Sequence, residues 1–286
     1  MDKFEKLIQT HFDSLSKSQR KVAQFLLNYP EQFAVQSASE IGSAVGVSET
    51  TVIRFCHALD FTGFAGMQKH VREQLLLKRS NLDQFYSEKV AFSQERLFFG
   101  NVMKQDALNI QHTSEQLKEA SLEAASKRII EADKVIIAGM RTSYAAAHWL
   151  SFTLRMGKES VHLFRPDTDD PIALLQECTD NTVFIGISFP RYALQTIKMA
   201  EYMQERGAYI IGITDSAVAP IQKYADLVLS IQSSNTSTID MAPILFSYLH
   251  SLVSYVLVKN EAQFKQRKEL YELVNRDDFF LKEGDD

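Results

Sequence analysis

The chain has 286 residues, of which 45% are apolar and 23% are charged, and its formal net charge is −5 at pH 7. This length favours roughly two domains, and the composition excludes a disordered, collagen-like or disulfide-stapled protein. Cys56 and Cys178 lie far apart and belong to no metal-binding motif. We therefore expect two buried thiols in a reducing compartment, with no metal and no other cofactor.

Nothing in the sequence favours a membrane protein. The chain starts with mixed charges and without an apolar signal core. The most apolar stretch, residues 241–258, is interrupted by Pro243 and His250. It predicts a buried helix rather than a membrane span, and we expect a cytoplasmic protein without a membrane partner.

Residues 1–79 are predicted to form an all-helical domain. Apolar residues recur there with helical spacing, no strand pattern appears, and Pro30 is expected to end the second helix. The segment holds ten Lys/Arg and eight Asp/Glu, whereas the rest of the chain holds 21 and 28. The small positive excess has the sign expected of a DNA-binding domain but does not establish one by itself.

Residues 80–121 are predicted to be a linker and a connecting helix. The part from Ser80 to about Gln94 is polar and mixed, and a helical pattern resumes over residues 95–112. The next helical pattern, over residues 122–131, opens the second predicted domain, which spans residues 122–286.

Short β-branched runs follow in the second domain, and helical patterns separate most of them. Continuous apolar strands with helices between them indicate a parallel sheet covered on both faces. The predicted fold is therefore α + α/β, a helical bundle followed by a doubly wound parallel sheet. The expected strands are centred on residues 135–137, 161–163, 183–187, 209–213 and 227–229.

Residues 38–59 have the pattern of a helix-turn-helix. Ser39 is expected to cap a short helix, Gly46 to adopt a positive φ at the turn, and Ser48 to cap the second helix. The buried face of that second helix is predicted to comprise Val52, Phe55, Cys56 and Leu59. Its opposite face would enter the major groove of duplex DNA. The predicted DNA-binding residues are Ser48, Glu49, Thr50, Thr51, Arg54 and His57, joined by Lys17, Arg20 and Lys21 of an earlier helix.

A purely structural role, without DNA binding, also stays open for this motif. Two-helix corners with a glycine at the turn are common, and the three basic residues equally suit a solvated helix face. The flanking helical patterns, over residues 17–27 and 64–77, favour a compact DNA-binding bundle.

Residues 47–55 (VSETTVIRF) and 59–64 (LDFTGF) resemble the helix-turn-helix signature of RpiR-type transcription regulators. Asp60 stands where that family usually has glycine. The family carries a sugar-isomerase (SIS) domain behind its DNA-binding domain, and the resemblance covers essentially the whole chain in this order. It implies a regulator that binds a palindromic operator as a homo-oligomer, a dimer or tetramer, and that senses a phosphosugar or other carbohydrate derivative.

Loops that follow two predicted strands are the candidate effector site. In a doubly wound sheet, ligands bind beyond the carboxyl ends of the strands, and both loops lead into a helix N-terminus that suits an anion. A Ser/Thr-rich stretch, residues 233–238, is a third contributor or equally a solvated loop. The predicted effector-binding residues are Gly139, Met140, Arg141, Thr142, Ser143, Ser188, Arg191, Tyr192, Ser237 and Thr238.

The two loops depart from the glycine- and hydroxyl-rich SIS loops that the resemblance implies. Arg141 replaces a glycine, and Pro190 and Arg191 replace residues of the second loop. We expect two guanidinium groups to hold a small anion, with Ser143 and Ser188 hydrogen-bonding it. Each arginine equally suits a surface salt bridge, and a closed site would leave a domain used for oligomerisation alone.

A sugar-phosphate isomerase or a non-catalytic SIS binding module is the alternative function. Isomerisation needs a base such as Glu or His beside the substrate. Family isomerases tend to carry Glu just before the last helix, where this chain has the shorter Asp240, which could equally cap that helix. His148 and His250 have apolar neighbours typical of core histidines. We therefore expect no catalytic residue.

Overall fold

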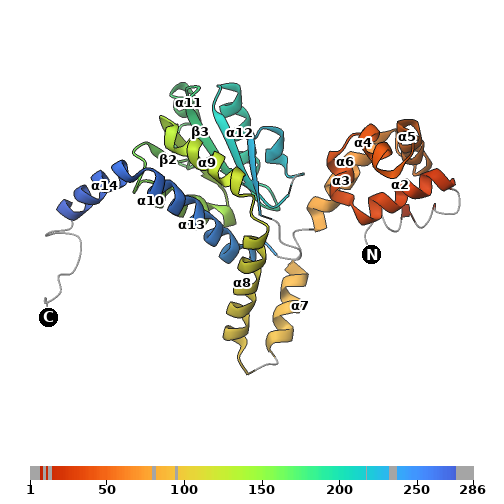
Figure 1. Ribbon diagram of the computed structural model, residues 1–286, viewed down its shortest axis with the longest axis horizontal. Coiled ribbons are helices and arrows are strands. Elements are labelled where there is room, and N and C mark those ends of the chain that lie inside the picture. Colours follow the sequence, from red (N-terminus) through yellow and green to blue (C-terminus); the bar gives the residue numbers. More distant parts are fainter. Residues whose placement is uncertain are drawn as a thin grey trace. The chain divides into compact units, whose positions relative to one another are not determined.

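The computed structural model describes residues 7–8, 11, 15–78, 82–93, 96–216, 218–231 and 237–274. The chain divides into two compact units, Met1–Gln84 and Phe85–Asp286 (Figure 1).

The first unit is a helical bundle over the residues described between 15 and 78. Its helices are α2 (Lys17–Asn28), α3 (Pro30–Val35), α4 (Ala38–Val45), α5 (Glu49–Ala58) and α6 (Phe64–Lys78). Large apolar side chains from all five helices are fully buried, which accounts for the helical spacing of apolar residues in the sequence. They include Val22, Leu26, Phe33, Ile41, Val52, Phe55, Met67 and Val71.

Two helix boundaries in this bundle differ from the prediction. Pro30 does lie beyond the end of α2, but it also opens α3, where its missing N–H would have no helical partner in any case. Helix α4 is capped by Ser37 and not by Ser39. The Ser37 hydroxyl accepts from the N–H of Glu40 (3.2 Å), and the Glu40 carboxylate accepts from the N–H of Ser37 (2.7 Å). This reciprocal pair is a capping box, whose Ser-x-x-Glu spacing is readable in the sequence.

The second unit is built on a five-stranded parallel sheet in the order β2-β1-β3-β4-β5. All five predicted strands are confirmed. Their bounds are β1 Lys134–Gly139, β2 Val161–Leu163, β3 Thr182–Ile187, β4 Tyr209–Thr214 and β5 Leu227–Ser230. The order reverses between β1 and β3, which are direct neighbours, so this is the switch point of the doubly wound sheet.

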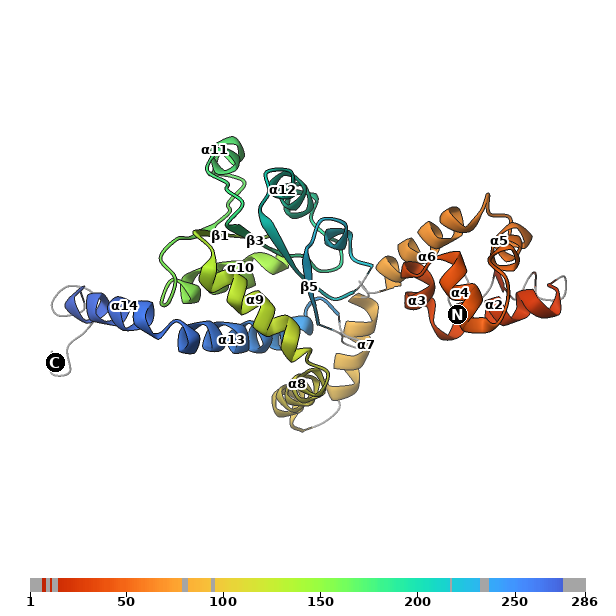
Figure 2. The ribbon, with the colours of Figure 1, turned by 45° about the horizontal axis from the view of Figure 1, so that its top comes forward.

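Helices cover both faces of the sheet (Figure 2). Helices α9 (Glu119–Glu131), α10 (Thr142–Leu154) and α13 (Met241–Lys259) share one apolar core with strand residues such as Ile137 and Ile185. Helices α11 (Pro171–Gln176) and α12 (Leu194–Glu205) and the 3-10 helix η2 (Pro220–Lys223) share the other with Ile136 and Phe184. Adjacent strand residues therefore face opposite cores, which is why the strands read as continuous apolar runs.

Helix α13 is long and apolar enough to cross a membrane by length and composition alone. It packs instead against α8 (Phe98–Glu115), α9 and α10, and the side chains facing them are buried. This agrees with the predicted buried helix. The last described helix is α14 (Glu261–Val274).

The segment predicted as a polar linker is largely helical. Helix α7 (Leu82–Ser93) lies beside α8 in both views (Figures 1 and 2). Phe85, Lys89 and Phe92 recur on one side of it, with the Lys89 ammonium 5.3 Å and 5.7 Å from the two ring centroids. Charged residues interrupt the apolar spacing of this helix, which is why the sequence pattern did not reveal it.

Candidate functional site

Helix α5 has the predicted cap and the predicted buried face. The Ser48 hydroxyl accepts from the N–H of Thr51 (3.3 Å) and lies 2.9 Å from the Thr51 hydroxyl. Val52, Phe55 and Cys56 are fully buried. The opposite face carries Glu49, Thr50, Arg54 and His57, which are exposed, whereas Thr51 is half-buried.

The turn before α5 depends on two glycines. Gly46 has φ 68° and ψ 47°, the left-handed conformation predicted for it. Gly42 was not singled out in the sequence, although a Cβ there would lie 2.8 Å from the carbonyl oxygen of Val47. Only hydrogen at this position lets α4 approach the start of α5 so closely. A glycine inside a helical pattern was the available signal.

The three basic residues of α2 that were predicted to contact phosphates are exposed. Lys17, Arg20 and Lys21 lie in the first turns of α2, which packs against α5. The Gln19 side-chain amide donates to the backbone carbonyl of Arg54 (3.2 Å). The start of α2 therefore borders the face of α5 that carries Arg54. His57 differs, because its Nδ1 contacts the carbonyl of Phe61 (3.0 Å) and helps to close the turn after α5.

In the second unit, the loops after β1 and β3 start side by side. Gly139 at the end of β1 pairs in register with Ile187 at the end of β3, so the loops that follow leave the sheet side by side. We call these two loops, residues 139–143 and 188–192, the β1–β3 loop pair. Each loop contains an arginine with positive φ, 57° at Arg141 and 67° at Arg191. Among the described residues, neither α10 nor α12 has a side-chain cap. At the start of α10, the N–H groups of Ser143 and Tyr144 donate to the carbonyls of Met140 and Arg141 (both 3.1 Å).

The hydroxyls of the β1–β3 loop pair differ in their surroundings. Ser143 and Ser188 are both buried, and the Ser188 hydroxyl has no hydrogen-bond partner among the described residues. Buried polar groups are normally paired, so this unpaired hydroxyl at the switch point of the sheet is exceptional. Gly139 acts differently, since a Cβ there would lie 2.6 Å from the Ser143 carbonyl oxygen. It lets α10 pack closely against β1.

Tyr192 reaches across to the next strand. Its hydroxyl donates to the carboxylate of Asp215 (2.9 Å), directly after β4. The hydroxyl of Thr214 donates to the Ser188 carbonyl (2.6 Å). Asp215 is buried and was missed in the sequence, because only the sheet order brings it beside the second loop. Tyr192 thus braces this loop through a hydrogen bond.

The third predicted contributor is described only in part, because residues 233–236 lie outside the described residues. The Ser237 hydroxyl accepts from the N–H of Ile239 (3.2 Å) and Asp240 (3.1 Å), and it donates to the Asp240 carboxylate (3.0 Å). Thr238, in the same turn, is half-buried. Asp240 does not cap α13 with its side chain. Its other carboxylate oxygen lies 2.9 Å from Lys89 Nζ of α7, which the sequence could not indicate.

The two histidines expected in the core are exposed. His148 lies beside Tyr144 on α10, and His250 lies beside Trp149, with ring centroids 6.3 Å and 6.4 Å apart respectively. They occupy the outer sides of α10 and α13, where the apolar neighbours in sequence face the opposite way. Among the described residues no group of three or more His, Cys, Asp or Glu could hold a metal ion.

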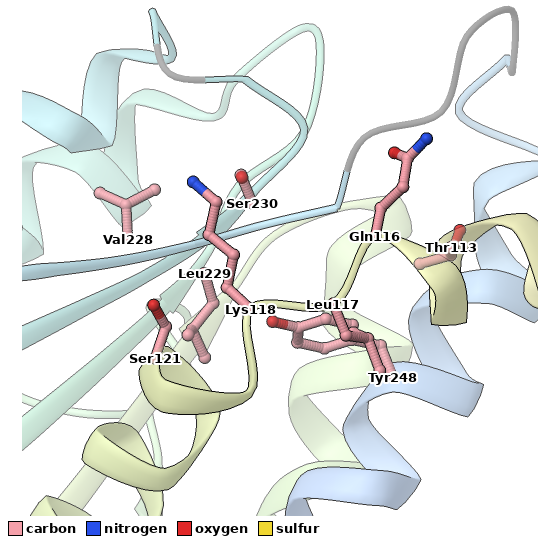
Figure 3. A pocket seen from close by; sticks show the side chains of 9 residues that line it. All are labelled: Thr113, Gln116, Leu117, Lys118, Ser121, Val228, Leu229, Ser230 and Tyr248. Atoms are coloured by element: carbon pink, nitrogen blue, oxygen red, sulfur yellow. The ribbon is translucent and has the colours of Figure 1, made fainter.

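A hollow open to solvent lies at the end of β5, between the start of α9 and helix α13 (Figure 3). Lys118 and Ser230 stand at its upper side, and the hydroxyl of Tyr248 points into it. Burial raises the pKa of Tyr248 to about 12, and the nearby Glu119 charge adds to the shift. The sequence gave no signal for this hollow, since its lining residues come from four separate elements.

Two family models match the chain in the order of its units. The rpiR-family helix-turn-helix domain matches residues 2–77, and the SIS domain matches residues 128–259. The chain belongs to the RpiR family of transcription regulators. This RpiR-type chain is therefore a DNA-binding transcription regulator, and the resemblance seen in its helix-turn-helix residues is confirmed.

Curated relatives of this RpiR-type regulator carry the same description. The transcriptional regulator HexR of Escherichia coli is 26% identical over 84% of this chain and 81% of its own length. An uncharacterised helix-turn-helix regulator of Haemophilus influenzae is 26% identical over 76% of each chain. Both relatives are named as transcriptional regulators.

Three solved structures share the fold of this chain. NanR of Vibrio vulnificus, complexed with ManNAc-6P, has a TM-score of 0.58 and 17% identity, and the match covers 93% of this chain and 96% of NanR. The sugar isomerase domain of an RpiR transcription factor from Sphaerobacter thermophilus has a TM-score of 0.55 and 24% identity, covering 60% of this chain and 97% of that one. A putative sugar-phosphate isomerase from Listeria monocytogenes scores 0.52 at 16% identity, covering 62% and 98%.

Proposed function

We propose that this regulator senses a small anionic sugar derivative, of the phosphosugar class, at the β1–β3 loop pair. The observation that carries the proposal is the combination of two arginines held at positive φ with the orphaned, buried hydroxyl of Ser188. Arg141 and Arg191 would hold the anion, and Ser143 and Ser188 would hydrogen-bond it beside the starts of α10 and α12.

The backbone strain supports a role in binding. A non-glycine residue in the left-handed region or beyond it costs about 1–3 kcal/mol, and such residues cluster at ligand-binding sites. Here two of them are arginines of the β1–β3 loop pair. Arg141 lies directly before α10 and Arg191 lies three residues before α12, and neither helix has a side-chain cap among the described residues. A guanidinium group binds phosphate or carboxylate through two parallel N–H donors.

The ligand class is supported by a relative of the same fold. NanR of Vibrio vulnificus was solved in complex with ManNAc-6P, a sugar phosphate. We assign this chain a ligand of the same class, while its arginine-bearing loops favour an anion held by side chains.

We further propose that the protein lacks isomerase turnover. Asp240 stands where family isomerases tend to carry the base. One of its carboxylate oxygens lies 2.9 Å from Lys89 Nζ and the other accepts from Ser237, so both oxygens are already engaged and neither is placed to take a proton from carbon. The regulator would act in the cytoplasm as a homo-oligomer on a palindromic duplex. Its half-sites would be separated by about 34–36 Å or a multiple of that.

Calorimetry of the full-length protein tests the location and the class of the ligand together. ManNAc-6P, glucose 6-phosphate and inorganic phosphate are titrated into wild type, Arg141→Ala, Arg191→Ala and Arg191→Lys. A charge-assisted hydrogen bond contributes about 1.5–3 kcal/mol, so each alanine variant should bind about 10- to 100-fold more weakly. Lysine should recover only part of the loss, because an ammonium group lacks the two-pronged geometry.

The hollow beside β5 is the competing location, and it supplies the matched control. Lys118→Ala removes one cation from that hollow and leaves the β1–β3 loop pair intact. Weaker binding in Lys118→Ala together with wild-type affinity in both arginine variants would move the ligand to the hollow. Absence of binding by every sugar phosphate to wild type would reject the ligand class.

A further inference from the structure

A largely buried ion pair joins α7 to the start of α13. Lys89 Nζ of α7 lies 2.9 Å from Asp240 Oδ1 at the start of α13, and the two side chains are only 15% and 9% exposed. The Lys89 ammonium also lies over the rings of Phe85 and Phe92. This lysine is therefore held from several sides at a place with little access to water.

A second carboxylate depends on the same cation. Burial raises the pKa of Asp106 on α8, the Asp240 charge raises it further, and Lys89 opposes both. Without Lys89, the repulsion between the Asp106 and Asp240 charges would lose the cation that offsets it. Removing one partner of a buried ion pair leaves an uncompensated charge and is strongly destabilising. Lys89 therefore fixes α7 against the body of the unit.

The ion pair continues into the turn predicted to bind the effector. The second carboxylate oxygen of Asp240 accepts from the Ser237 hydroxyl (3.0 Å), and that hydroxyl also accepts from two N–H groups of the turn. Lys89, Asp240 and Ser237 thus form one chain of hydrogen bonds from α7 to the effector-binding turn. An anion that takes a hydrogen bond from Ser237 must remove it from Asp240, and it would compete with Asp240 for the ammonium group.

We propose that effector binding weakens the Lys89–Asp240 pair, loosens α7 and so changes the affinity for DNA. Residues 82–93 join the helix-turn-helix unit to the SIS unit along the chain, so a change in α7 reaches the connection between them. The inference rests on the proposed function and adds one requirement, that the anionic effector held at the β1–β3 loop pair also reaches the Ser237–Thr238 turn. Allosteric coupling requires an element with two states, a ligand that favours one of them, and a second binding site whose affinity depends on that state.

The first test follows amide hydrogen exchange of residues 85–93 in the full-length protein. The single variant Lys89→Met keeps an aliphatic side chain beside Phe85 and Phe92 but removes the positive charge. The double variant Lys89→Met/Asp240→Asn removes both charges, so it leaves no buried Asp240 charge without a partner that could cause misfolding. Lys104→Met, which removes the same charge from an exposed position on α8, is the control. The double variant should exchange faster than wild type and Lys104→Met without any ligand. Equal amide exchange rates in wild type, Lys104→Met and the double variant would show that Lys89 does not fix α7 to the rest of the unit.

The second test measures DNA affinity with and without ManNAc-6P, glucose 6-phosphate and inorganic phosphate. The probe is a duplex enriched from a random-sequence library by the wild-type protein. Allosteric effectors typically change affinity by about 5- to 150-fold. The double variant should bind the sugar phosphate more weakly than wild type, because Arg141 and Arg191 remain but the Lys89 ammonium is gone, and at saturating ligand its DNA affinity should change by less than about twofold. A wild-type response in that variant would overturn the inference, whereas wild type that binds none of the probes would overturn the proposed function on which it rests.

Discussion

Arg54 is the side chain of α5 best placed to read a base. It is exposed on the face opposite Val52 and Phe55, and its backbone is held by the Gln19 amide of α2. Thr51 is less diagnostic, because its N–H and hydroxyl both contact Ser48, so its removal would also weaken the cap of the helix.

Arg54→Ala should weaken specific DNA binding by about 1–3 kcal/mol, the discrimination that a good base contact provides. Stability should change little, since the side chain is exposed. Lys69→Ala on α6, whose side chain is 79% exposed, removes the same charge elsewhere in the unit and serves as the control. The comparison uses one fixed salt concentration, because phosphate contacts make affinity salt-dependent. Equal affinity of the two variants would exclude Arg54 from the groove.

At the scale of single residues, sequence patterns found some site residues and missed others for a physical reason. Arg141 and Arg191 could be chosen because they depart from a known loop pattern. Lys89 and Asp215 could not, because their importance comes from partners far away along the chain. A lysine in a polar segment has no sequence feature that distinguishes a buried ion pair from a solvated surface.

At the scale of elements, the contact between α4 and α5 is set by the absence of a side chain. The ideal Cβ of an alanine at position 42 would lie 2.8 Å from the Val47 carbonyl oxygen and 3.3 Å from the Glu49 nitrogen. Both are backbone atoms, so the two helices would have to separate.

Gly42→Ala should destabilise the first unit by about 1–3 kcal/mol, the usual cost of overpacking. Gly100→Ala on α8, where nothing lies within 4 Å of the new Cβ, should stabilise its helix by about 0.4–1 kcal/mol. Urea unfolding followed by circular dichroism measures both. Trp149, the single tryptophan of the chain, lies in the second unit, so its fluorescence transition should not move in Gly42→Ala. Unchanged stability of the first unit would show that α4 and α5 tolerate a wider separation.

The elements that could be predicted are those whose burial is regular. The central strands β1, β3 and β4 are buried on both faces, so they appear in the sequence as unbroken apolar runs. The edge strand β5 is only partly buried but is apolar from Leu227 to Leu229. The short helix α3 and the charged helix α7 have no such regularity. Helix α7 is held in place by a lysine, Lys89, and the spacing of apolar residues gives no information about such a contact.

At the scale of the whole molecule, each unit contains one buried free cysteine, Cys56 in the first and Cys178 in the second. Burial raises the pKa of Cys56 to about 12 and raises that of Cys178. Each native thiol therefore stays protonated and unreactive at pH 8. The folded state holds this proton more tightly than the unfolded chain, so stability falls as the pH rises above about 8.5, the ordinary thiol pKa.

Brief alkylation at pH 8 in increasing urea should reveal separate unfolding of the two units. Neither cysteine should react in the native protein, and peptide mass spectrometry should show the two becoming reactive at different urea concentrations. Gly42→Ala should lower the urea concentration for Cys56 alone. Simultaneous labelling of both cysteines in wild type and in Gly42→Ala would indicate one cooperative unit instead of two.

Helix α13 has a consequence for how the chain is made. It is the most apolar helix and comes after its packing partners α8, α9 and α10 in the chain. Domains fold as the ribosome delivers them from the N-terminus, and exposed apolar surface favours aggregation during that time. Because the surfaces that receive α13 are already synthesised when it emerges, this segment can be covered as soon as it leaves the exit tunnel. A circular permutation that moved α13 ahead of α8 would keep every native contact and lengthen the time for which the nascent chain needs a chaperone.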